Sequence, residues 1–341
     1  MKGDVQPTAM KRKKISQRIE LQNIVGVDLG GTNVRAALVN PHGRVSRIEK
    51  IEIGSDTRFE RVAGLIADVI KKSALSASAD AAVFSAVGIG SPGPLDRVTG
   101  VIPETKNLNW VNAPLTQTVS ELLGGLPVYL ENDAHAHAWG EFIAGAARGC
   151  DDMVMLTLGT GVGGAIICNS RLLLGKDGGA GHIGAMPIDL DSPRQQGFSG
   201  TVESLCSATA IAKTARILLD ERPDAVSSLR SLPDDKLNAR AVSDAAADGD
   251  PIAREVWDFT GRRLGVACAA LANILNTERI IIGGGASAAW DHFYPALMEE
   301  LERRTWRTMF KRVRVVQAAL GDAAGIIGAA GLARMRLSDS R

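Results

Sequence analysis

Two glycine-rich turns of the same design lie in the two halves of this chain. The first, at 28–33, reads Asp-Leu-Gly-Gly-Thr-Asn, and the second, at 158–164, reads Leu-Gly-Thr-Gly-Val-Gly-Gly. Each turn stands between two apolar runs, which predicts a strand, a turn and a second strand. Glycines in such turns supply positive φ angles and let backbone N–H groups approach phosphate oxygens with no side chain in the way. The pair therefore predicts two phosphate-binding hairpins that face one cleft.

The chain after each turn separates two kinds of nucleotide site. Gly159, Gly161 and Gly164 match the spacing G-x-G-x-x-G, but the dinucleotide fingerprint requires a helix after the turn, and a strand-like run follows here. The phosphate loop G-x-x-x-x-G-K-[ST] does not occur in the sequence. An ordinary tight hairpin is the alternative for either turn alone. Two matched turns, the first of which carries Asp28, favour phosphate binding.

Five further segments share their order and spacing with one known family. They are 88–96, 107–110, 131–134, 281–285 and 325–330. Together with the two turns they resemble the ROK sugar kinases, of the actin, hexokinase and Hsp70 ATPase superfamily, from about Ile24 to about Arg336. The resemblance implies a two-lobed α/β fold, the ribonuclease H-like fold of actin-like ATPases, with duplicated mixed sheets flanked by helices and a cleft between the lobes.

Size and charge restrict the class of protein. The 341 residues exceed the usual size of a single core, and so two domains are expected. A formal net charge of +1 predicts no attraction to nucleic acid or anionic lipid, and no apolar stretch is long and uncharged enough to span a bilayer. The basic run 11–14 is followed by polar residues and not by the apolar core of a signal peptide. We therefore expect a cytoplasmic protein without nucleic-acid or membrane partners.

These landmarks divide the chain into parts. We expect a mobile basic tail at 1–23, a smaller α/β lobe at 24–132 and a larger α/β lobe at 133–320, with a final helix at about 321–338 that packs on the smaller lobe. Apolar residues recur at helical spacing in several segments. The predicted helices cover 59–72, 134–146, 209–219, 251–276 and 294–305.

The resemblance implies ATP-dependent phosphorylation of a hexose, with glucose and its 6-hydroxyl group as the first choice. Such a transfer needs a base for the hydroxyl proton, Mg²⁺ for the phosphate charge and donors that align both substrates. Asp133 matches the catalytic aspartate of the family and lies between an extended segment and a predicted helix. It is the candidate base. The alternative is a helix cap, because Asn-Asp before an Ala-rich helix is also a start signal.

Four other residues are candidate sugar ligands. The amides of Asn107 and Asn132 suit the vicinal hydroxyl groups of a sugar, although each alone could bond its own backbone. His182 stands where the family has either the glutamate or the downstream histidine of G-E-x-G-H, with a buried structural histidine as the alternative. Glu203 matches the last sugar-binding carboxylate of the family and would accept a bond from a hydroxyl group.

The nucleotide side follows from the glycine segments. Asp28 is implied to lie beside Mg²⁺, through water, which suits an ion that keeps most of its hydration shell. Gly283, Gly284 and Gly285 are implied to let the nucleoside of ATP lie flat against backbone, with a helix-ending glycine run as the alternative. The phosphates are expected to contact Gly30, Gly31, Thr32, Asn33, Gly159, Thr160, Gly161 and Gly163.

The zinc site that most of the family carries is missing from this sequence. The family holds zinc with a histidine and a C-x-C-G-x-x-G-C cluster, whereas segment 192–203 contains no cysteine and Ala185 stands where the histidine is expected. The four cysteines are widely scattered. His135 and His137 are two apart on a predicted helix, so their side chains diverge, which favours solvent or interlobe contacts over a metal. We expect a zinc-less branch of the family.

Three other functions are considered. The chain could phosphorylate N-acetylmannosamine, fructose or another hexose. Some ROK proteins are sugar-responsive repressors with a DNA-binding domain before the first turn, and the 23 residues before Ile24 are too few for one. A sugar-binding protein that has lost catalysis is the third reading, which the presence of Asp28, Asp133 and both turns opposes. A homodimer is the usual assembly in the family.

Overall fold

The computed structural model describes residues 22–76, 83–105, 108–192 and 199–339. Within them the chain forms two compact units. The first unit takes its residues from Met1–Gly149, Lys176–Gly178 and Ala319–Arg341, and the second unit from Cys150–Gly175 and Gly179–Ala318. The sequence predicts this division after Asn132. It falls after Gly149 because the helix that follows Asn132 packs on the C-terminal helix, within the first unit.

The first unit is built on a five-stranded mixed sheet in the order β3-β2-β1-β4-β7. Strands β1, β2 and β3 pair antiparallel, whereas β1 with β4 and β4 with β7 pair parallel. The strands are β1 (Asn23–Leu29), β2 (Asn33–Val39), β3 (Glu49–Glu52), β4 (Phe84–Ser91) and β7 (Val128–Asn132), with a separate hairpin of β5 (Ile102–Glu104) and β6 (Val111–Ala113).

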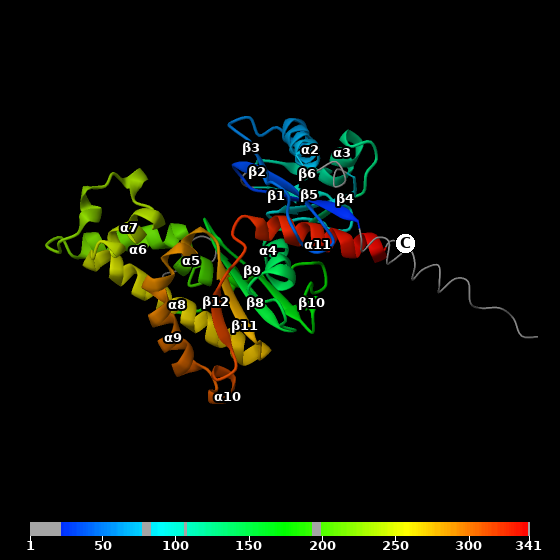
Figure 1. The fold of residues 1–341 in the computed structure, drawn as a ribbon. Coiled ribbons are helices and arrows are strands. Elements are labelled where there is room, and N and C mark those ends of the chain that lie inside the picture. The colour runs from blue at the N-terminus through cyan, green and yellow to red at the C-terminus, as the bar shows by residue number, and fades with distance from the viewer. Residues whose placement is uncertain (1–21, 77–82, 106–107, 193–198, 340–341) are drawn as a thin grey trace, which may run out of the picture. The chain divides into compact units, whose positions relative to one another are not determined.

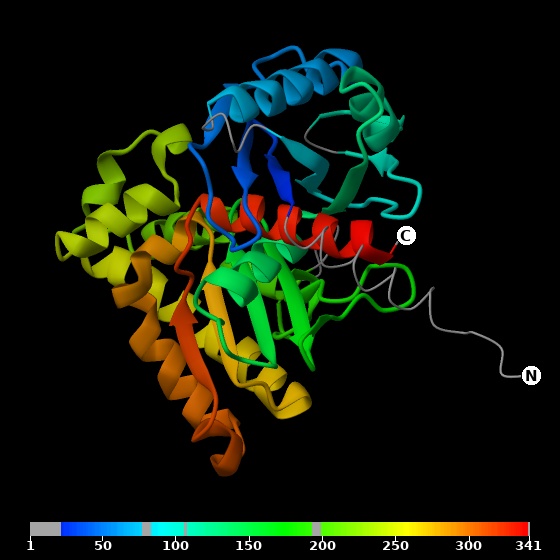
Figure 2. The ribbon, with the colours of Figure 1, turned by 45° about the vertical axis from the view of Figure 1, so that its right-hand side comes forward.

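Helices cover both faces of this sheet. Helix α2 (Phe59–Leu75) packs on one face next to α3 (Leu115–Leu122), and α11 (Ala323–Asp339) crosses the other face beside α4 (Asp133–Ala144) (Figures 1 and 2). Strand alternation assigns the residues of β1: Val25, Val27 and Leu29 join the core under α2, whereas Ile24 packs with α11. Asp28 has the parity of Ile24 and therefore belongs to the face that α4 and α11 cover.

Glycines allow α11 to lie directly on the strands. A Cβ atom on Gly26 would overlap the carbonyl oxygen of Ile326, and one on Gly88 would overlap that of Ala329. Gly328 on α11 makes the same close approach to Ala136 on α4. Helix α11 is consequently held against β1, β4 and α4 by backbone contact.

Replacing Gly88 with alanine is expected to destabilise the protein by about 3 kcal/mol or more, since the extra methyl group meets backbone that cannot move without displacing α11. Gly64, inside α2, is the matched control. A Cβ there meets no atom within 4 Å, and so Gly64→Ala should stabilise by roughly 0.5–1 kcal/mol. Urea unfolding of the two variants measures both effects. Equal stabilities would contradict this account of the packing.

The second unit repeats the same sheet plan in the order β10-β9-β8-β11-β12. Strands β8, β9 and β10 pair antiparallel, and β8 with β11 and β11 with β12 pair parallel, as in the first unit. This repetition confirms the expected duplicated mixed sheets. The strands are β8 (Met153–Leu158), β9 (Val162–Cys168), β10 (Arg171–Leu172), β11 (Arg279–Gly283) and β12 (Arg314–Gln317).

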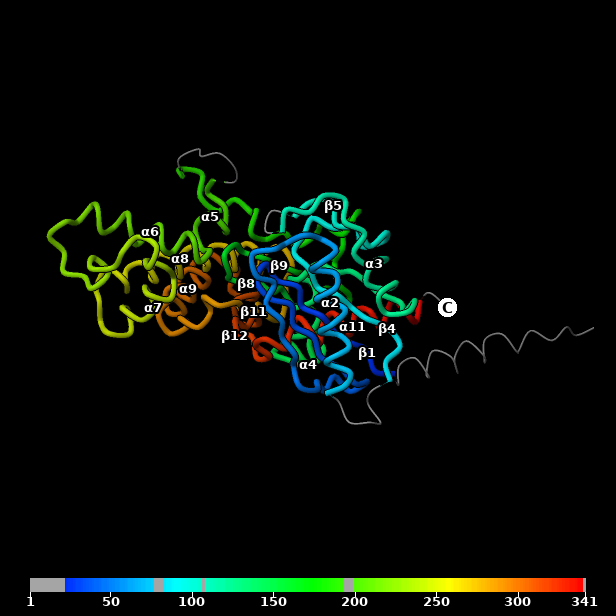
Figure 3. Tube along the Cα trace, turned by 90° about the horizontal axis from the view of Figure 1, so that it is seen from above, coloured from blue at the N-terminus to red at the C-terminus, as the bar shows by residue number. Residues whose placement is uncertain are grey.

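The helices of the second unit bury an apolar core around Trp257 and Phe293. Helices α6, α7 and α8 pack together (Figure 3), and α8 lies along α9. The helices predicted at 209–219, 251–276 and 294–305 are present as α6, α8 and α9, with bounds shifted by a few residues. The helices are α5 (Val202–Cys206), α6 (Ala208–Glu221), α7 (Ala239–Ala247), α8 (Pro251–Leu275), α9 (Trp290–Arg304) and α10 (Arg307–Phe310). Among the described residues, none of the helices has the length and apolar character needed to cross a bilayer.

Candidate functional site

The first glycine turn joins β1 to β2. Gly30 donates its N–H to the carbonyl of Asn33 at 3.0 Å, while Gly31 and Thr32 are exposed. A Cβ atom on Gly30 would meet only the carbonyl oxygen of Asn33, at 3.4 Å, so the space above the turn is open. The expected positive φ is wrong for Gly30, whose backbone lies outside the left-handed region. This glycine keeps a surface clear and is not required by backbone conformation.

The second turn joins β8 to β9 and is supported by the start of α6. The N–H of Ala208 donates to the carbonyl of Gly159 at 2.8 Å, and the hydroxyl of Thr209 donates to that of Thr160 at 3.0 Å. A Cβ on Gly159 would meet only one atom, at 3.9 Å. Neither Gly159 nor Gly161 has a φ in the left-handed region, so the expectation of positive φ is wrong here also. A flat, open turn of this kind leaves room for a phosphate.

Glu203 lies beside Gly161 and explains why that position is glycine. Its Oε2 atom accepts the N–H of Val162 at 2.9 Å, and a Cβ on Gly161 would overlap the same oxygen. Thr201 caps α5 by accepting the N–H of Ser204, which orients the helix that carries Glu203. The carboxylate of Glu203, which is predicted to bind sugar, therefore contacts the second glycine turn, which is predicted to bind phosphate. Sequence spacing could not show this contact, since the residues are 41 positions apart.

The third glycine segment abuts the second turn. Gly283 ends β11 opposite Thr157, and Gly284 follows at φ +84°. A Cβ on Gly284 would overlap backbone atoms of Leu158, whereas one on Gly285 would meet nothing within 4 Å. The segment ends a strand and starts a short 3₁₀ helix, so the alternative of a helix-ending glycine run is wrong. Gly285 provides an open backbone surface next to the turn.

His182 is exposed and begins a short 3₁₀ helix that is packed against β9. Its exposure rules out the alternative of a buried structural histidine. Gly184, two residues later, has its backbone against the carbonyl of Val162, which ties this segment to the second turn. Asn107, the remaining candidate sugar ligand, lies outside the described residues.

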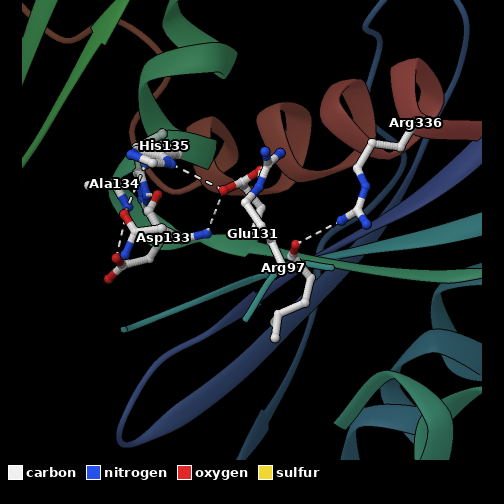
Figure 4. Close-up of polar contacts among 9 residues, drawn as sticks. Arg97, Glu131, Asp133, Ala134, His135 and Arg336 are labelled. Atoms are coloured by element: carbon white, nitrogen blue, oxygen red, sulfur yellow. Dashed lines mark hydrogen bonds and ion pairs between the residues drawn. The ribbon is translucent and has the colours of Figure 1, made fainter. Parts of the chain in front are cut away.

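Asp133 is the first residue of α4 (Figure 4) and is half-buried. Its Oδ1 atom accepts the N–H of Ala134 at 2.8 Å, and its carbonyl accepts Nδ1–H of His137 at 2.8 Å. The helix is capped instead by Asn132, whose Oδ1 accepts the N–H of His135 at 3.2 Å. The capping alternative for Asp133 is therefore wrong, and the role belongs to its neighbour.

The electrostatic surroundings of Asp133 suit a proton acceptor. Burial raises the pKa of its carboxyl group, and the negative charge of Asp28 raises this pKa further, whereas His137, the Ala134 N–H and His135 oppose the rise. Among carboxylic bases, one with a raised pKa takes up a proton more readily. Asp28 itself is 8% exposed and forms an ion pair with Arg35 at 3.1 Å.

The donor set fits Mg²⁺ better than a metal held entirely by protein ligands. Asp28 and Asp133 are close enough for their charges to interact, and both are carboxylates. The described part of the chain holds no group of three His, Cys, Asp or Glu side chains placed to bind one ion. Mg²⁺ usually keeps several waters and uses one or two protein carboxylates together with substrate phosphates.

The segment that would carry the family's zinc is closed by backbone bonds. Ile188 and Asp189 both donate N–H to the carbonyl of Gly200, at 2.8 and 3.0 Å. Residues 193–198 between them lie outside the described residues. Cys206, the nearest cysteine in sequence, is fully buried, and burial raises the pKa of its thiol to about 12. A thiol kept neutral in this way is a poor zinc ligand, because zinc binds the thiolate.

The sequence analysis missed a buried group of charges at the end of β7. Glu131 accepts bonds from Arg97 and His135 (Figure 4). Both Glu131 and His135 are less than 5% exposed. The expected solvent or interlobe contact is wrong for His135, which is buried and bonded to Glu131 at the end of β7, whereas His137 is half-buried and bonded to the carbonyl of Asp133 on its own helix. The four-residue spacing of Glu131 and His135 was the available signal.

Comparison with known proteins places the chain in a family. The model of the ROK family matches residues 24–336. A glucokinase from Thermotoga maritima is 35% identical over 321 residues, which cover 92% of this chain and 98% of that protein.

Solved structures agree. A ROK family glucokinase from Streptomyces griseus, in complex with glucose and AMPPNP, is similar with a TM-score of 0.74 and 32% identity, over 92% of this chain and 99% of that one. A ROK family transcriptional regulator, a homologue of the E. coli MLC protein, has a TM-score of 0.81 and 26% identity, over 93% of this chain and 78% of that one. With two mixed sheets flanked by helices and a family match along almost its whole length, this chain belongs to the ROK family and has the actin-like ATPase fold of that family.

Proposed function

We propose that this chain transfers the γ-phosphate of ATP to a hexose, with glucose and its 6-hydroxyl group as the substrate. The observation that carries the proposal is the setting of Asp133: a carboxylate of raised pKa at the start of α4, beside the buried Asp28, in a chain with two open glycine turns. The similarity to glucokinases, one of them solved with glucose and AMPPNP, supports the choice of substrates.

Asp133 is proposed as the general base. It would accept the proton of the sugar hydroxyl as the oxygen attacks the phosphorus atom, and partial burial keeps the carboxylate basic. Asn132 uses Oδ1 for the helix cap, which leaves the Nδ2 group to donate to a sugar oxygen. Asn107, His182 and Glu203 are proposed as further sugar ligands.

The two turns and the third glycine segment are proposed to bind the nucleotide. Backbone groups at Gly30 and Gly159 face space that a side chain would fill, which suits phosphate oxygens. Gly285 would lie against the nucleoside. When bound, Mg²⁺ supplies positive charge that offsets the charge of the transferred phosphate. Asp28 would hold the water shell of this ion, and the guanidinium of Arg35 keeps Asp28 in place.

A coupled ADP-release assay over a panel of hexoses tests the substrate. Glucose should give the highest kcat/KM, with N-acetylmannosamine and fructose as the competing candidates. If another hexose is preferred, the protein is still a hexose kinase, but glucose is not its main substrate. Sugar binding without any sugar-dependent ADP release would favour a non-catalytic sugar-binding protein, an alternative that is consistent with the similarity to a transcriptional regulator.

We also propose that the protein forms a homodimer, and light scattering can test this.

The purified protein is expected to contain no stoichiometric zinc and to require Mg²⁺ for turnover. No tetrahedral ligand set can be drawn from Ala185 and the cysteine-free segment 192–203. A zinc-selective chelator should therefore leave activity and Tm unchanged, whereas EDTA should stop turnover until excess Mg²⁺ is added. Elemental analysis that finds about one zinc per chain would contradict the zinc-less assignment.

A further inference from the structure

Arg97, Glu131 and His135, which we call the junction cluster, meet where β7 passes into α4 (Figure 4). The Glu131 carboxylate accepts a hydrogen bond from Nε–H of Arg97 at 2.9 Å, and a second nitrogen of the same guanidinium donates to the same oxygen. Its other oxygen contacts Nδ1 of His135 at 3.1 Å and accepts the N–H of Asn132, also at 3.1 Å. Both carboxylate oxygens are thus used by groups from three places in the chain.

The junction cluster is buried, and its charges are compensated locally. Glu131 is 4% exposed and His135 is 3% exposed. Burial alone would favour the neutral form of Glu131, but His135, Arg97 and the Asn132 N–H together hold its pKa below the ordinary value. Arg336, on α11, faces the same region and donates to the carbonyl of Leu130 at 3.2 Å, with Tyr129 under its guanidinium. A carboxylate in such surroundings keeps its position, because moving it would give up these partners at a buried site where an unpaired charge is costly.

The contacts enclose Asp133. Glu131 lies two residues before it and His135 two residues after it, and the bond between their side chains closes a ring around 132–134. The bonds from Glu131 to the Asn132 N–H and from Asn132 to the His135 N–H tighten the same ring. The bonds that Asp133 makes itself are to Ala134 and His137, on its own helix. Its direction is therefore set by the backbone that the ring holds.

We propose that the junction cluster is a set of positioning residues that fixes the backbone of Asp133 and aims its carboxylate at the sugar hydroxyl. Arg97 is the anchor, because it follows β4 in sequence and attaches the ring to a segment 34 residues away. The catalytic consequence rests on the proposed function, whereas the fixing of the backbone does not. Misplacing a catalytic group by about 1 Å is enough to cost on the order of 10²-fold in rate.

Glu131→Gln and Arg97→Met are the test variants, with turnover, ligand affinity and amide hydrogen exchange measured in each. We expect kcat to fall about 10- to 100-fold in both, while the Kd for ATP changes less than about threefold and the Kd for sugar, which Asn132 inside the ring is proposed to bind, rises by less than kcat falls. Exchange at the amides of 132–135 should become faster. The double variant should be no worse than the poorer single variant, because one device is lost in each case. Arg97→Lys, which keeps a cation, should recover part of kcat.

Glu49→Gln is the matched control. Glu49, on β3, is also 4% exposed and pairs with Lys72 at 2.9 Å, but it lies outside the machinery around Asp133. It should lower Tm to a similar extent and leave kcat unchanged. Since Arg97 is partly exposed, its variants remain informative if Glu131→Gln does not fold.

Two results would overturn the positioning role. One is a kcat within about twofold of wild type in folded Glu131→Gln and Arg97→Met, and the other is a fall in kcat matched by equal losses of sugar and ATP affinity. If the wild-type protein phosphorylates no hexose, the proposed function fails. Hydrogen exchange then decides the inference alone: unchanged exchange at 132–135 in these variants would refute it, and faster exchange confined to that segment would support it.

Discussion

Replacing Asp133 with asparagine is expected to lower kcat by roughly two to four orders of magnitude, the usual contribution of a general base. The change is nearly isosteric, and the Oδ1 atom of the new amide can still accept the N–H of Ala134. Sugar affinity measured by calorimetry should therefore stay within about threefold of wild type, because only the proton acceptor is lost. A variant that retains more than about a tenth of wild-type kcat would exclude Asp133 as the base.

The control for this variant is Asp250→Asn. Asp250 is a buried aspartate just before α8, where its Oδ1 atom caps the helix by accepting the N–H of Ala253 and its Oδ2 atom accepts the N–H of Ser228. Asparagine keeps the cap but loses the second acceptor, so this variant should have a lower Tm and unchanged kcat. Asp250 belongs to no part of the proposed site. Normal turnover in Asp250→Asn shows that losing a carboxylate at a helix start does not by itself abolish activity.

The pH dependence of turnover should reflect the ionisation of the Asp133 carboxyl group. Since the pKa of Asp133 is raised, turnover should be lost as pH falls through a value above that of an ordinary aspartate. The folded protein also holds this proton more tightly than the unfolded chain, so ionised Asp133 costs stability above its folded pKa and nothing below its unfolded pKa. Asp133→Asn should consequently have a Tm at neutral pH equal to or above that of wild type.

Gly161→Val is expected to weaken both sugar and ATP binding, with kcat/KM falling on the order of 10²-fold for each substrate. The new side chain would occupy the position of the Glu203 carboxylate and break its bond to the N–H of Val162. Displacing Glu203 removes a proposed sugar ligand, and the altered turn no longer presents its backbone to phosphate. An effect on ATP alone, which would follow if Gly161 contacted only the phosphates, is therefore not expected.

Gly159→Ala separates the two effects. A Cβ at this position enters open space beside the turn and does not approach Glu203. It should raise the KM for ATP and leave sugar affinity unchanged, as measured by calorimetry without nucleotide. If Gly161→Val binds sugar as tightly as wild type, then the contact between Glu203 and the turn does not contribute to sugar binding.

Local patterns predicted much of the fold. Apolar runs placed the strands around both turns, and helical apolar spacing placed the long helix α8, whose observed end at Leu275 lies one residue from the predicted one. The lobe boundary differed, because the assignment of α4 depends on Gly328 lying against Ala136, a contact between distant segments. Helical periodicity carries no information about which sheet a helix joins.

The candidate site was less accessible to sequence reasoning. Asp133 and Glu203 were singled out by resemblance, but the partners that hold them were not. Arg97 and Glu131 are 34 positions apart, and only folding shows that they meet. The glycines were assigned to positive φ, whereas Gly161 is required by the oxygen of Glu203 beside it. A glycine in a turn has several possible reasons, and the backbone is needed to choose among them.

Following the γ-phosphate of ATP by ³¹P NMR in the presence of glucose tests the central claim most directly. The account predicts that wild-type protein with Mg²⁺ transfers the phosphate to the 6-hydroxyl group, seen as glucose 6-phosphate, and that Asp133→Asn transfers it roughly two to four orders of magnitude more slowly. Phosphate that passes only to water, or glucose binding without any transfer, would contradict it.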